Sequence, residues 1–204
     1  MKTVICLTIW QLPLALLAEP APAGTATSFL EDHDARVREI VLASDTLSAE
    51  DRDRVQALIN EAFDFRELAR LSLGDHWPER TGEERDEFVG LFRAIIERQN
   101  FDLFVRYHRE GRIAYTSEER DEAGRTVVRA EVPLRQETKQ IAYFLHRAET
   151  DGGQGPWRIY DLAVDGAGTA EANRRSYTRY IARHSYPRLL DALRRKLDKL
   201  EGRS

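Results

Sequence analysis

Apolar residues in the first half of the chain recur every three or four positions, which is the spacing of amphipathic helices. Three of these helices are expected to begin at Ser48, Asp64 and Thr81, because each has a carboxylate three positions later and therefore resembles a helix cap. The second of them should end near Gly74. The third is the longest, and its broad apolar face extends toward Phe104.

The pattern changes after Gly111, where apolar and polar residues alternate as they do in strands with one buried face. The alternating segments are separated by turn residues, in particular 121–124 and the glycine-rich stretch 152–156, which we interpret as a loop. The expected strands cover residues 113–115, 128–134, 141–146 and 157–162. Together they predict an antiparallel sheet of about four strands.

The chain is expected to close with two helices, at 171–184 and 187–200, with Pro187 in the first turn of the second. Helices therefore come first, then strands, then helices again. This order is typical of the α+β class, because a parallel sheet would require strands and helices to alternate. The length of 204 residues suits one domain, which we place at residues 24–204.

The N-terminus has the features of a secretory signal peptide, and residues 1–23 are assigned to this segment. Lys2 precedes an apolar run over residues 4–17, and small residues and prolines follow. The run is too short and too interrupted to span a membrane. Cleavage is expected after Ala18 or Ala23, and a retained N-terminal anchor is the alternative.

Between the signal peptide and the first helix, residues 19–33 are rich in Pro, Ala, Gly and Thr and are expected to form a linker. A short helix should follow over residues 37–41. The only cysteine, Cys6, is removed with the signal peptide. The mature chain would therefore contain no disulfide and no thiolate ligand.

Charge is distributed unevenly along a chain whose formal net charge is −4. Residues 171–204 hold ten Lys and Arg against four Asp and Glu, whereas residues 24–170 hold 20 against 30. The basic helices could face anionic lipid or an acidic protein, or they could be a solvated face paired in part with the acidic body. A nucleic-acid partner is not expected for an exported acidic chain.

The sequence contains no motif of a hydrolase, metalloprotease, nucleotide-binding loop or dinucleotide-binding turn. Its five histidines never share the helical spacing of metal ligands, so neither a metal nor a cofactor is expected. Asp161 with a strand tyrosine could form an acid–base pair. The simpler interpretation is that Asp161 is a cap or ion-pair residue and that the tyrosines pack. The strand tyrosines are Tyr115, Tyr143 and Tyr160.

Residues 63–77 read FDFRELARLSLGDHW and resemble the fDf..ma...LG..W segment of the MlaC (toluene-tolerance auxiliary) family. Residues 81–92 are similar to the t..qr..F...F helix of that family, and residues 157–161 are similar to its W.v.D strand. Residues 175–177 and 189–193 fit its closing helices. The order of these motifs agrees with the family along nearly all of the mature chain.

The resemblance implies a non-catalytic periplasmic carrier that binds phospholipid as cargo. Family members are similar to NTF2-like cones, in which a curved sheet and helices enclose an apolar cavity for lipid tails, with the headgroup near the mouth. They carry phospholipid between an outer-membrane lipoprotein–porin complex and an inner-membrane MCE–ABC transporter complex. This traffic supports the lipid asymmetry of the outer membrane.

Two turns depart from the family pattern. A Gly-Val-Ser-Leu-like turn after the last strand is replaced by residues 166–170, and the glycine between the last two helices is replaced near Ser185. These changes leave turn geometry and partner docking open. A hopanoid-associated branch of the superfamily is an alternative for the lipid class. The alternatives of other classes are an NTF2-like enzyme acting on an apolar small molecule and an exported adaptor that binds an acidic partner through its basic helices.

The candidate cavity residues are the inward-facing positions of the expected strands and three apolar residues of the long helix. They are Phe92, Ile95, Ile96, Ile113, Tyr115, Val128, Ala130, Val132, Ile141, Tyr143 and Leu145. An ordinary filled core would have the same pattern, so the two interpretations stay open here. Trp77 and Trp157 are expected to pack in the core or at the mouth, and Asp161 is expected to be structural.

Overall fold

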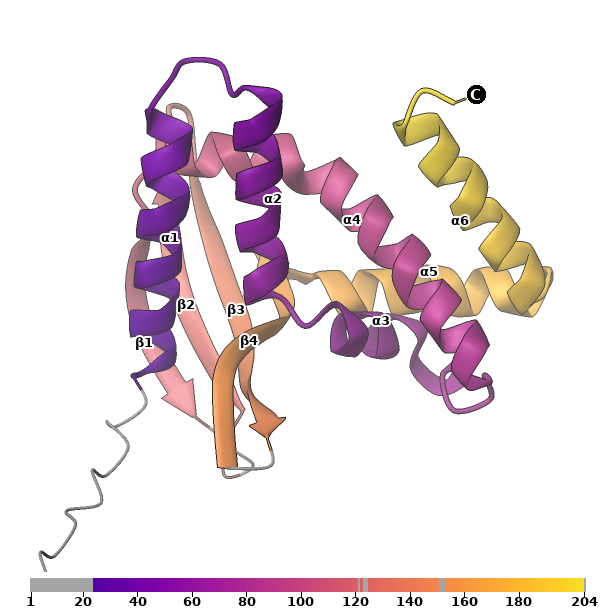
Figure 1. Ribbon diagram of the computed structural model, residues 1–204. Coiled ribbons are helices and arrows are strands. Elements are labelled where there is room, and N and C mark those ends of the chain that lie inside the picture. Colours follow the sequence, from indigo (N-terminus) through magenta and orange to yellow (C-terminus); the bar gives the residue numbers. More distant parts are fainter. Residues whose placement is uncertain (1–23, 121, 123–124, 151–152, 204) are drawn as a thin grey trace, which may run out of the picture.

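The computed structural model describes residues 24–203 except 121, 123–124 and 151–152 (Figure 1). The described residues form six α-helices, one turn of 3-10 helix at Gly74–His76 and five strands. The helices are α1 (Ala26–Leu42), α2 (Ala49–Ala62), α3 (Phe65–Leu73), α4 (Gly82–Glu110), α5 (Thr169–Arg183) and α6 (Tyr186–Leu200). The strands are β1 (Ala114–Arg120), β2 (Thr126–Pro133), β3 (Thr138–Thr150), β4 (Gly153–Val164) and β5 (Ala167–Gly168).

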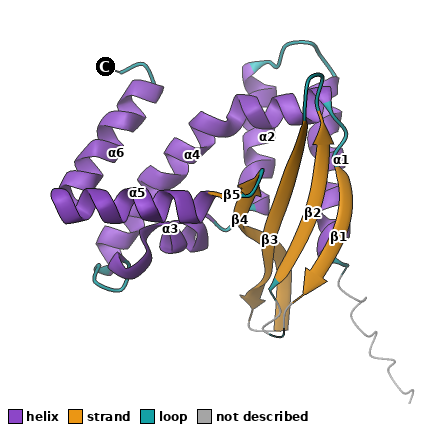
Figure 2. Cartoon of the chain, turned by 180° about the vertical axis from the view of Figure 1, so that it is seen from behind, coloured by secondary structure: helices purple, strands orange, loops and turns teal. Residues whose placement is uncertain are grey.

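The strands form one antiparallel sheet in which each strand pairs with the next along the chain (Figure 2). This arrangement confirms the predicted α+β class, with one strand more than the four expected. The additional strand β5 follows a two-residue turn at Asp165 and Gly166, whose φ angles are 49° and 81°. Positive φ at both positions is the geometry of a tight hairpin turn, for which Asp-Gly is a preferred pair.

The helices are arranged in two groups that α4 connects (Figure 1). The antiparallel pair α1 and α2 lies over the sheet, with α1 against β1 and β2 and α2 against β4. Helices α3, α5 and α6 pack together beside the sheet and contact α4. The first half of the long helix α4 therefore packs with α3, α5 and α6, and its second half packs with α1 and α2.

Three clusters of buried apolar side chains follow this division. The helical cluster lies among α3, the first half of α4, α5 and α6, and it consists of Leu68, Ala69, Leu73, Phe88, Phe92, Ile95, Ala170, Tyr186, Leu189, Leu190 and Leu193. The sheet cluster joins α1 to the inner face of the sheet, and it consists of Ala26, Leu30, Ala62, Tyr107, Val128, Ala130, Val132, Ile141, Tyr143, Leu145, Trp157 and Ile159. A third cluster lies between the α1–α2 pair and α4.

The helix starts expected from the sequence are confirmed. The side chains of Ser48, Asp64 and Thr81 each accept a hydrogen bond from the backbone N–H three residues later. Thr81 and Glu84 form a reciprocal capping box. Gly74 follows the last residue of α3 with φ of 59°, a conformation that glycine adopts without steric cost.

The predicted linker over residues 19–33 is wrong for its second part, because α1 begins at Ala26. Its N-terminus is capped locally by the Thr25 side chain and also by Glu118 of β1. The Glu118 carboxylate accepts hydrogen bonds from the backbone N–H groups of Ala26 and Thr27, at N···O distances of 3.3 and 2.9 Å. This second cap comes from a residue distant in sequence, so local composition could not indicate it.

Two other boundaries differ from the prediction. The helix expected to extend toward Phe104 continues to Glu110. The expected loop over residues 152–156 lies within β4 from Gly153 onward, because β4 pairs with the long strand β3 as far as the Thr150–Gly153 pair. Pairing with a neighbouring strand outweighs the low strand preference of glycine and proline there.

The expected signal peptide and most of the expected turn over residues 121–124 lie outside the described residues. Within the described part of the chain, no helix combines the length and the apolar character that crossing a membrane requires.

Candidate functional site

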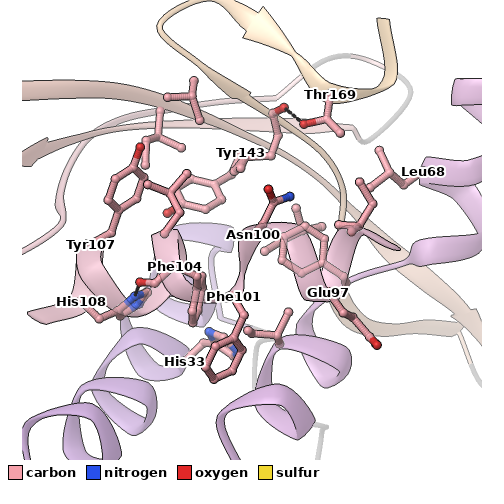
Figure 3. Close-up of a pocket in the computed structure, with 18 of the residues that line it drawn as sticks. His33, Leu68, Glu97, Asn100, Phe101, Phe104, Tyr107, His108, Tyr143 and Thr169 are labelled. Atoms are coloured by element: carbon pink, nitrogen blue, oxygen red, sulfur yellow. Dashed lines mark hydrogen bonds between the residues drawn. The ribbon is translucent and has the colours of Figure 1, made fainter. Parts of the chain in front are cut away.

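A cavity of about 330 Å³ lies between α4 and the sheet, with α1, α2 and α3 at its sides (Figure 3). Its volume is within the range of sites that hold small organic ligands. Most of the wall is apolar: Leu30, Ile59, Phe63, Phe65, Leu68, Ile96, Phe101, Leu103, Phe104, Ile113, Ile141, Ile159, Leu162, Val164 and Ala167. The polar lining residues are His33, Asp34, Gln56, Glu97, Asn100, Tyr107, His108, Tyr143 and Thr169.

The cavity has an exposed rim and a buried inner end. Asn100 and Leu103 of α4 and Ala167 of β5 are exposed, and the Leu103 side chain is 41% exposed. The buried polar members of the wall are His33, Tyr107, His108 and Tyr143. A ligand entering at the rim would therefore pass an apolar wall before it meets these polar groups.

The helical and strand periods explain which side chains face the cavity. On α4, Glu97, Phe101, Phe104 and His108 recur at intervals of three or four residues and so share one face of the helix. On β3, Ile141 and Tyr143 are two residues apart and share one face of the sheet.

A register shift in the sheet adds residues of β4 to the same face. The neighbours Phe144 and Leu145 of β3 pair with Asp161 and Ile159, so one residue of β4 is left over between them. Such a bulge lets Ile159 and Leu162, which are three residues apart, both face inward. The alternation of a regular strand would have placed them on opposite faces.

A hydrogen-bonded cluster of Asp34, His108 and Tyr115 lies at the inner end. The Asp34 Oδ1 and His108 Nε2 atoms are 3.1 Å apart, and the Tyr115 hydroxyl donates to the other carboxylate oxygen. His108 Nδ1 is 2.9 Å from the carbonyl oxygen of Phe104. Because a carbonyl only accepts, Nδ1 is the donor of this hydrogen bond, and Nε2 faces the Asp34 carboxylate.

Burial controls the protonation of the neighbouring groups. Burial raises the pKa of Tyr143 well above its ordinary value, and the Asp34 and Tyr107 groups raise it further. The pKa of Tyr115 is raised by the same cause and by the nearby Tyr143 and Asp34. Burial lowers the pKa of His33, whose Nε2 is 2.9 Å from the carbonyl oxygen of Leu58. These two phenols and this imidazole are therefore neutral at neutral pH.

The structure brings four of the eleven predicted cavity residues to the wall: Ile96, Ile113, Ile141 and Tyr143. It places Phe92 and Ile95 in the helical cluster, because the first half of α4 faces α3, α5 and α6. It places Val128, Ala130, Val132 and Leu145 in the sheet cluster under α1. Tyr115 lies behind the wall, where it donates to Asp34. Lipid contact stays a prediction for the four on the wall.

The sequence-based prediction did not include the cavity residues of the second half of α4 or of α1. Phe101, Phe104, Tyr107 and His108 continue the apolar face of α4, and the spacing of these four residues was a usable signal. Leu30 of α1 was not predicted as a cavity residue, because the composition of its segment is typical of a linker.

Asp161 lies outside the cavity wall, so the acid–base pair considered for an enzyme does not form there. Its Oδ1 accepts hydrogen bonds from the backbone N–H groups of Leu162 and Ala170, at 2.8 and 3.0 Å, and the second of these caps α5. Burial raises its pKa, and these hydrogen bonds oppose that shift. Among the described residues, no group of three or more His, Cys, Asp and Glu side chains is arranged to hold a metal ion.

Comparison with known proteins places this architecture in a family. No curated protein sequence matches the chain. Among solved structures, a phospholipid-binding protein from Ralstonia solanacearum, determined in complex with a phospholipid, superimposes with a TM-score of 0.74 at 18% sequence identity, covering 87% of this chain and 99% of that chain. At this identity the likeness establishes the fold. The MlaC family profile matches residues 34–195, and the protein therefore belongs to the MlaC family.

Proposed function

We propose that this protein is a periplasmic carrier that binds a phospholipid in the cavity between α4 and the sheet and moves it between the two membranes. The observation that carries the proposal is the cavity itself, whose wall is apolar and opens at an exposed rim. Family membership and the fold shared with a phospholipid-binding protein support the same ligand class. They favour binding over catalysis.

The physical need for a carrier follows from the hydrophobic effect. A phospholipid has roughly 30 tail methylenes, each worth about 0.8 kcal/mol on leaving water. Crossing an aqueous compartment unaided would expose an amphiphile with a transfer term on the order of 25 kcal/mol, so transfer would be very slow. A protein that covers the tails lowers this barrier, and release then requires a partner that opens the cavity or competes for the lipid.

Such partners would be the outer-membrane lipoprotein–porin complex and the inner-membrane MCE–ABC transporter complex. We assign docking to the basic helices α5 and α6, which carry the exposed residues Arg179, Arg183, Arg188 and Arg195. No carboxylate of the described residues forms an ion pair with these four side chains, in contrast to Arg194, which pairs with Glu87. Replacing Arg179 and Arg183 by Glu should weaken salt-sensitive binding to the transporter complex while lipid uptake stays unchanged.

The test of the carrier function is phospholipid transfer from donor to acceptor vesicles by the purified mature protein. Ile96→Trp places an indole ring in the space left for the lipid, and the lost space should reduce transfer about tenfold. Leu42→Trp is the matched control, because Leu42 is 51% exposed and lies outside the cavity wall. Equal transfer by Ile96→Trp and Leu42→Trp, with both variants folded, would contradict a carrier role for this cavity.

A further inference from the structure

The inner end of the cavity contains a hydroxyl group that the protein itself leaves unpaired. Tyr143 projects from the middle of β3, its side chain is only 9% exposed, and it lines the cavity (Figure 3). Its hydroxyl forms no hydrogen bond with any described residue. The same holds for Tyr107 of α4, which is 8% exposed and also lines the cavity.

Apart from Tyr107, the polar groups around Tyr143 already pair with one another. Asp34 accepts from Tyr115 through one oxygen and lies against His108 Nε2 through the other. The second nitrogen of His108 is occupied by the Phe104 carbonyl. The ring of Tyr143 is 6.1 Å from that of Tyr115, yet only the Tyr115 hydroxyl reaches the carboxylate. The hydroxyl of Tyr143 is therefore available to a group that occupies the cavity.

The Tyr143 hydroxyl oxygen is not among the fully buried, unpaired side-chain atoms of the described residues, which are Ser72 Oγ and Thr126 Oγ1, so it is open to the cavity. A hydrocarbon chain that displaced water from it would leave it without a hydrogen bond, at a cost of about 1–3 kcal/mol. A phenylalanine at the same position would fill the same space in an apolar wall without this cost. A cavity that held only hydrocarbon chains would gain nothing from the Tyr143 hydroxyl. A partner supplied by the ligand removes the penalty and adds a hydrogen bond.

The chemistry of the inner end restricts this partner to a neutral group. The Asp34 carboxylate lies on the same wall and would repel a phosphate or a carboxylate. Burial keeps the Tyr143 phenol protonated, so its hydroxyl can both donate to and accept from an alcohol. An anionic headgroup is therefore excluded from the inner end and would remain near the rim.

We propose that the inner end of the cavity, centred on Tyr143, binds a hydroxyl group carried within the apolar part of the lipid. The ligand class is an amphiphile with an embedded alcohol, either a hydroxylated acyl chain or a hydroxylated polycyclic lipid. This inference rests on the proposed function, because it takes the occupant of the cavity to be a lipid.

The test is competitive binding to the full mature protein. The acyl probes are lysophosphatidylethanolamines with an unsubstituted 18-carbon chain or the same chain hydroxylated at one position. The polycyclic probes are a hydroxylated hopane and the same hopane without the hydroxyl group. A diacyl phosphatidylethanolamine measures phospholipid binding as such. At least one hydroxylated probe should bind about five- to tenfold more tightly than its unsubstituted counterpart. Whether an acyl or a polycyclic probe shows the preference identifies the lipid class.

The variant that tests the assignment is Tyr143→Phe, which removes one oxygen and keeps the ring. It should abolish the preference for the hydroxylated probe, while the unsubstituted probe should bind at least as tightly as to wild type, because no hydroxyl is left unpaired. Tyr107→Phe shows whether the second hydroxyl contributes, and Tyr177→Phe is the matched control because Tyr177 packs in the helical cluster.

Two results would overturn the inference: equal binding of hydroxylated and unsubstituted probes by the wild-type protein, or a preference that survives in folded Tyr143→Phe. In both cases binding of the diacyl lipid would leave the carrier function intact. Failure of every lipid probe to bind would instead contradict the proposed function itself.

Discussion

In the helical cluster, the side chains of Phe88 and Phe92 stack with ring centroids 5.8 Å apart and are essentially inaccessible to solvent. Further along the same helix, Phe104 is only half-buried beside the cavity, and Leu103 is exposed at its rim. One half of α4 is thus part of a filled core and the other half is one wall of an open space. Side chains of the same chemical type serve packing in one region and leave room for a ligand in the other.

The cavity region compensates for this missing packing with polar contacts at its edges. Glu118 of β1 caps α1, and His146 Nε2 of β3 is 3.1 Å from Asp64, the cap of α3. Arg38 of α1 donates to the backbone carbonyls of His108, in the last turn of α4, and Gly111, just after its end. These contacts hold the walls in position without filling the space between them.

The largest effect expected from this contrast is on the stability of core variants. Phe88→Ala should lower the free energy of unfolding by about 3–5 kcal/mol, because it removes a fully buried ring that also contacts Tyr177 edge-on. Phe104→Ala should cost only about 1 kcal/mol, because its ring already borders open space. Urea unfolding of both variants measures the difference, and equal losses would show that the cavity region is packed like the helical cluster.

The sequence predicted those parts of the fold that depend on local signals. Ser48, Asp64 and Thr81 cap helices as expected, because a cap is formed by residues three positions apart. The start of α1 was missed because Glu118, which caps it, is more than 90 residues away along the chain.

The candidate site was predicted less well, for a geometric reason. Alternation correctly placed Val128 and Ile141 on one face of the sheet, but α1 covers the first and the cavity borders the second. Which part of a face is covered depends on where helices dock. Ile159 and Leu162 share that face only because of a register shift, which no periodic pattern encodes.

A second prediction concerns the polar edge of the cavity region. Glu118→Gln should lower stability at pH 7 by about 1 kcal/mol, since the capping carboxylate is lost and the site is largely exposed to solvent. Burial opposes ionisation of Glu118, but its hydrogen bonds to Thr27 and Ala26 outweigh this and lower its pKa. The stabilisation is therefore present above the ordinary value of 4.5 and lost as the pH falls through the folded-state pKa.

Chemical denaturation of wild type and Glu118→Gln between pH 7 and pH 3 tests this prediction. The two curves should converge at the acid end. Glu119→Gln, on the same strand, is the matched control and should differ little from wild type at either pH, because Glu119 forms only an exposed ion pair with Arg129 among the described residues.

A smaller effect on stability is expected from His33, at the inner end of the cavity. Burial lowers the pKa of His33 below its ordinary value of 6.5. The neutral imidazole therefore contributes its full stabilisation above pH 6.5, and this stabilisation decreases as the pH falls through the folded-state pKa. His33→Gln keeps a donor for the Leu58 carbonyl but cannot titrate. Its melting temperature should therefore fall less than that of wild type between pH 7.5 and pH 5, and parallel decreases would contradict the assignment.

The smallest effect is expected in the turn between α5 and α6. Ser185 has φ of 152°, a backbone conformation that favours glycine, while its hydroxyl accepts a long 3.4 Å hydrogen bond from the N–H of Arg188. Ser185→Gly should raise stability by up to about 0.5 kcal/mol, whereas Ser185→Ala loses the cap and keeps the strain. Thermal unfolding that ranks Ser185→Gly below wild type would show that the cap outweighs the backbone strain.

The central claim is that the space between α4 and the sheet is a lipid site and not an unfilled part of a core. Native mass spectrometry of the mature protein, purified from cells and again after incubation with phospholipid vesicles, tests it most directly. The account predicts an added mass of phospholipid size on wild type and on Leu42→Trp, and its loss on Ile96→Trp. A wild-type protein that remains free of lipid in both preparations would contradict it.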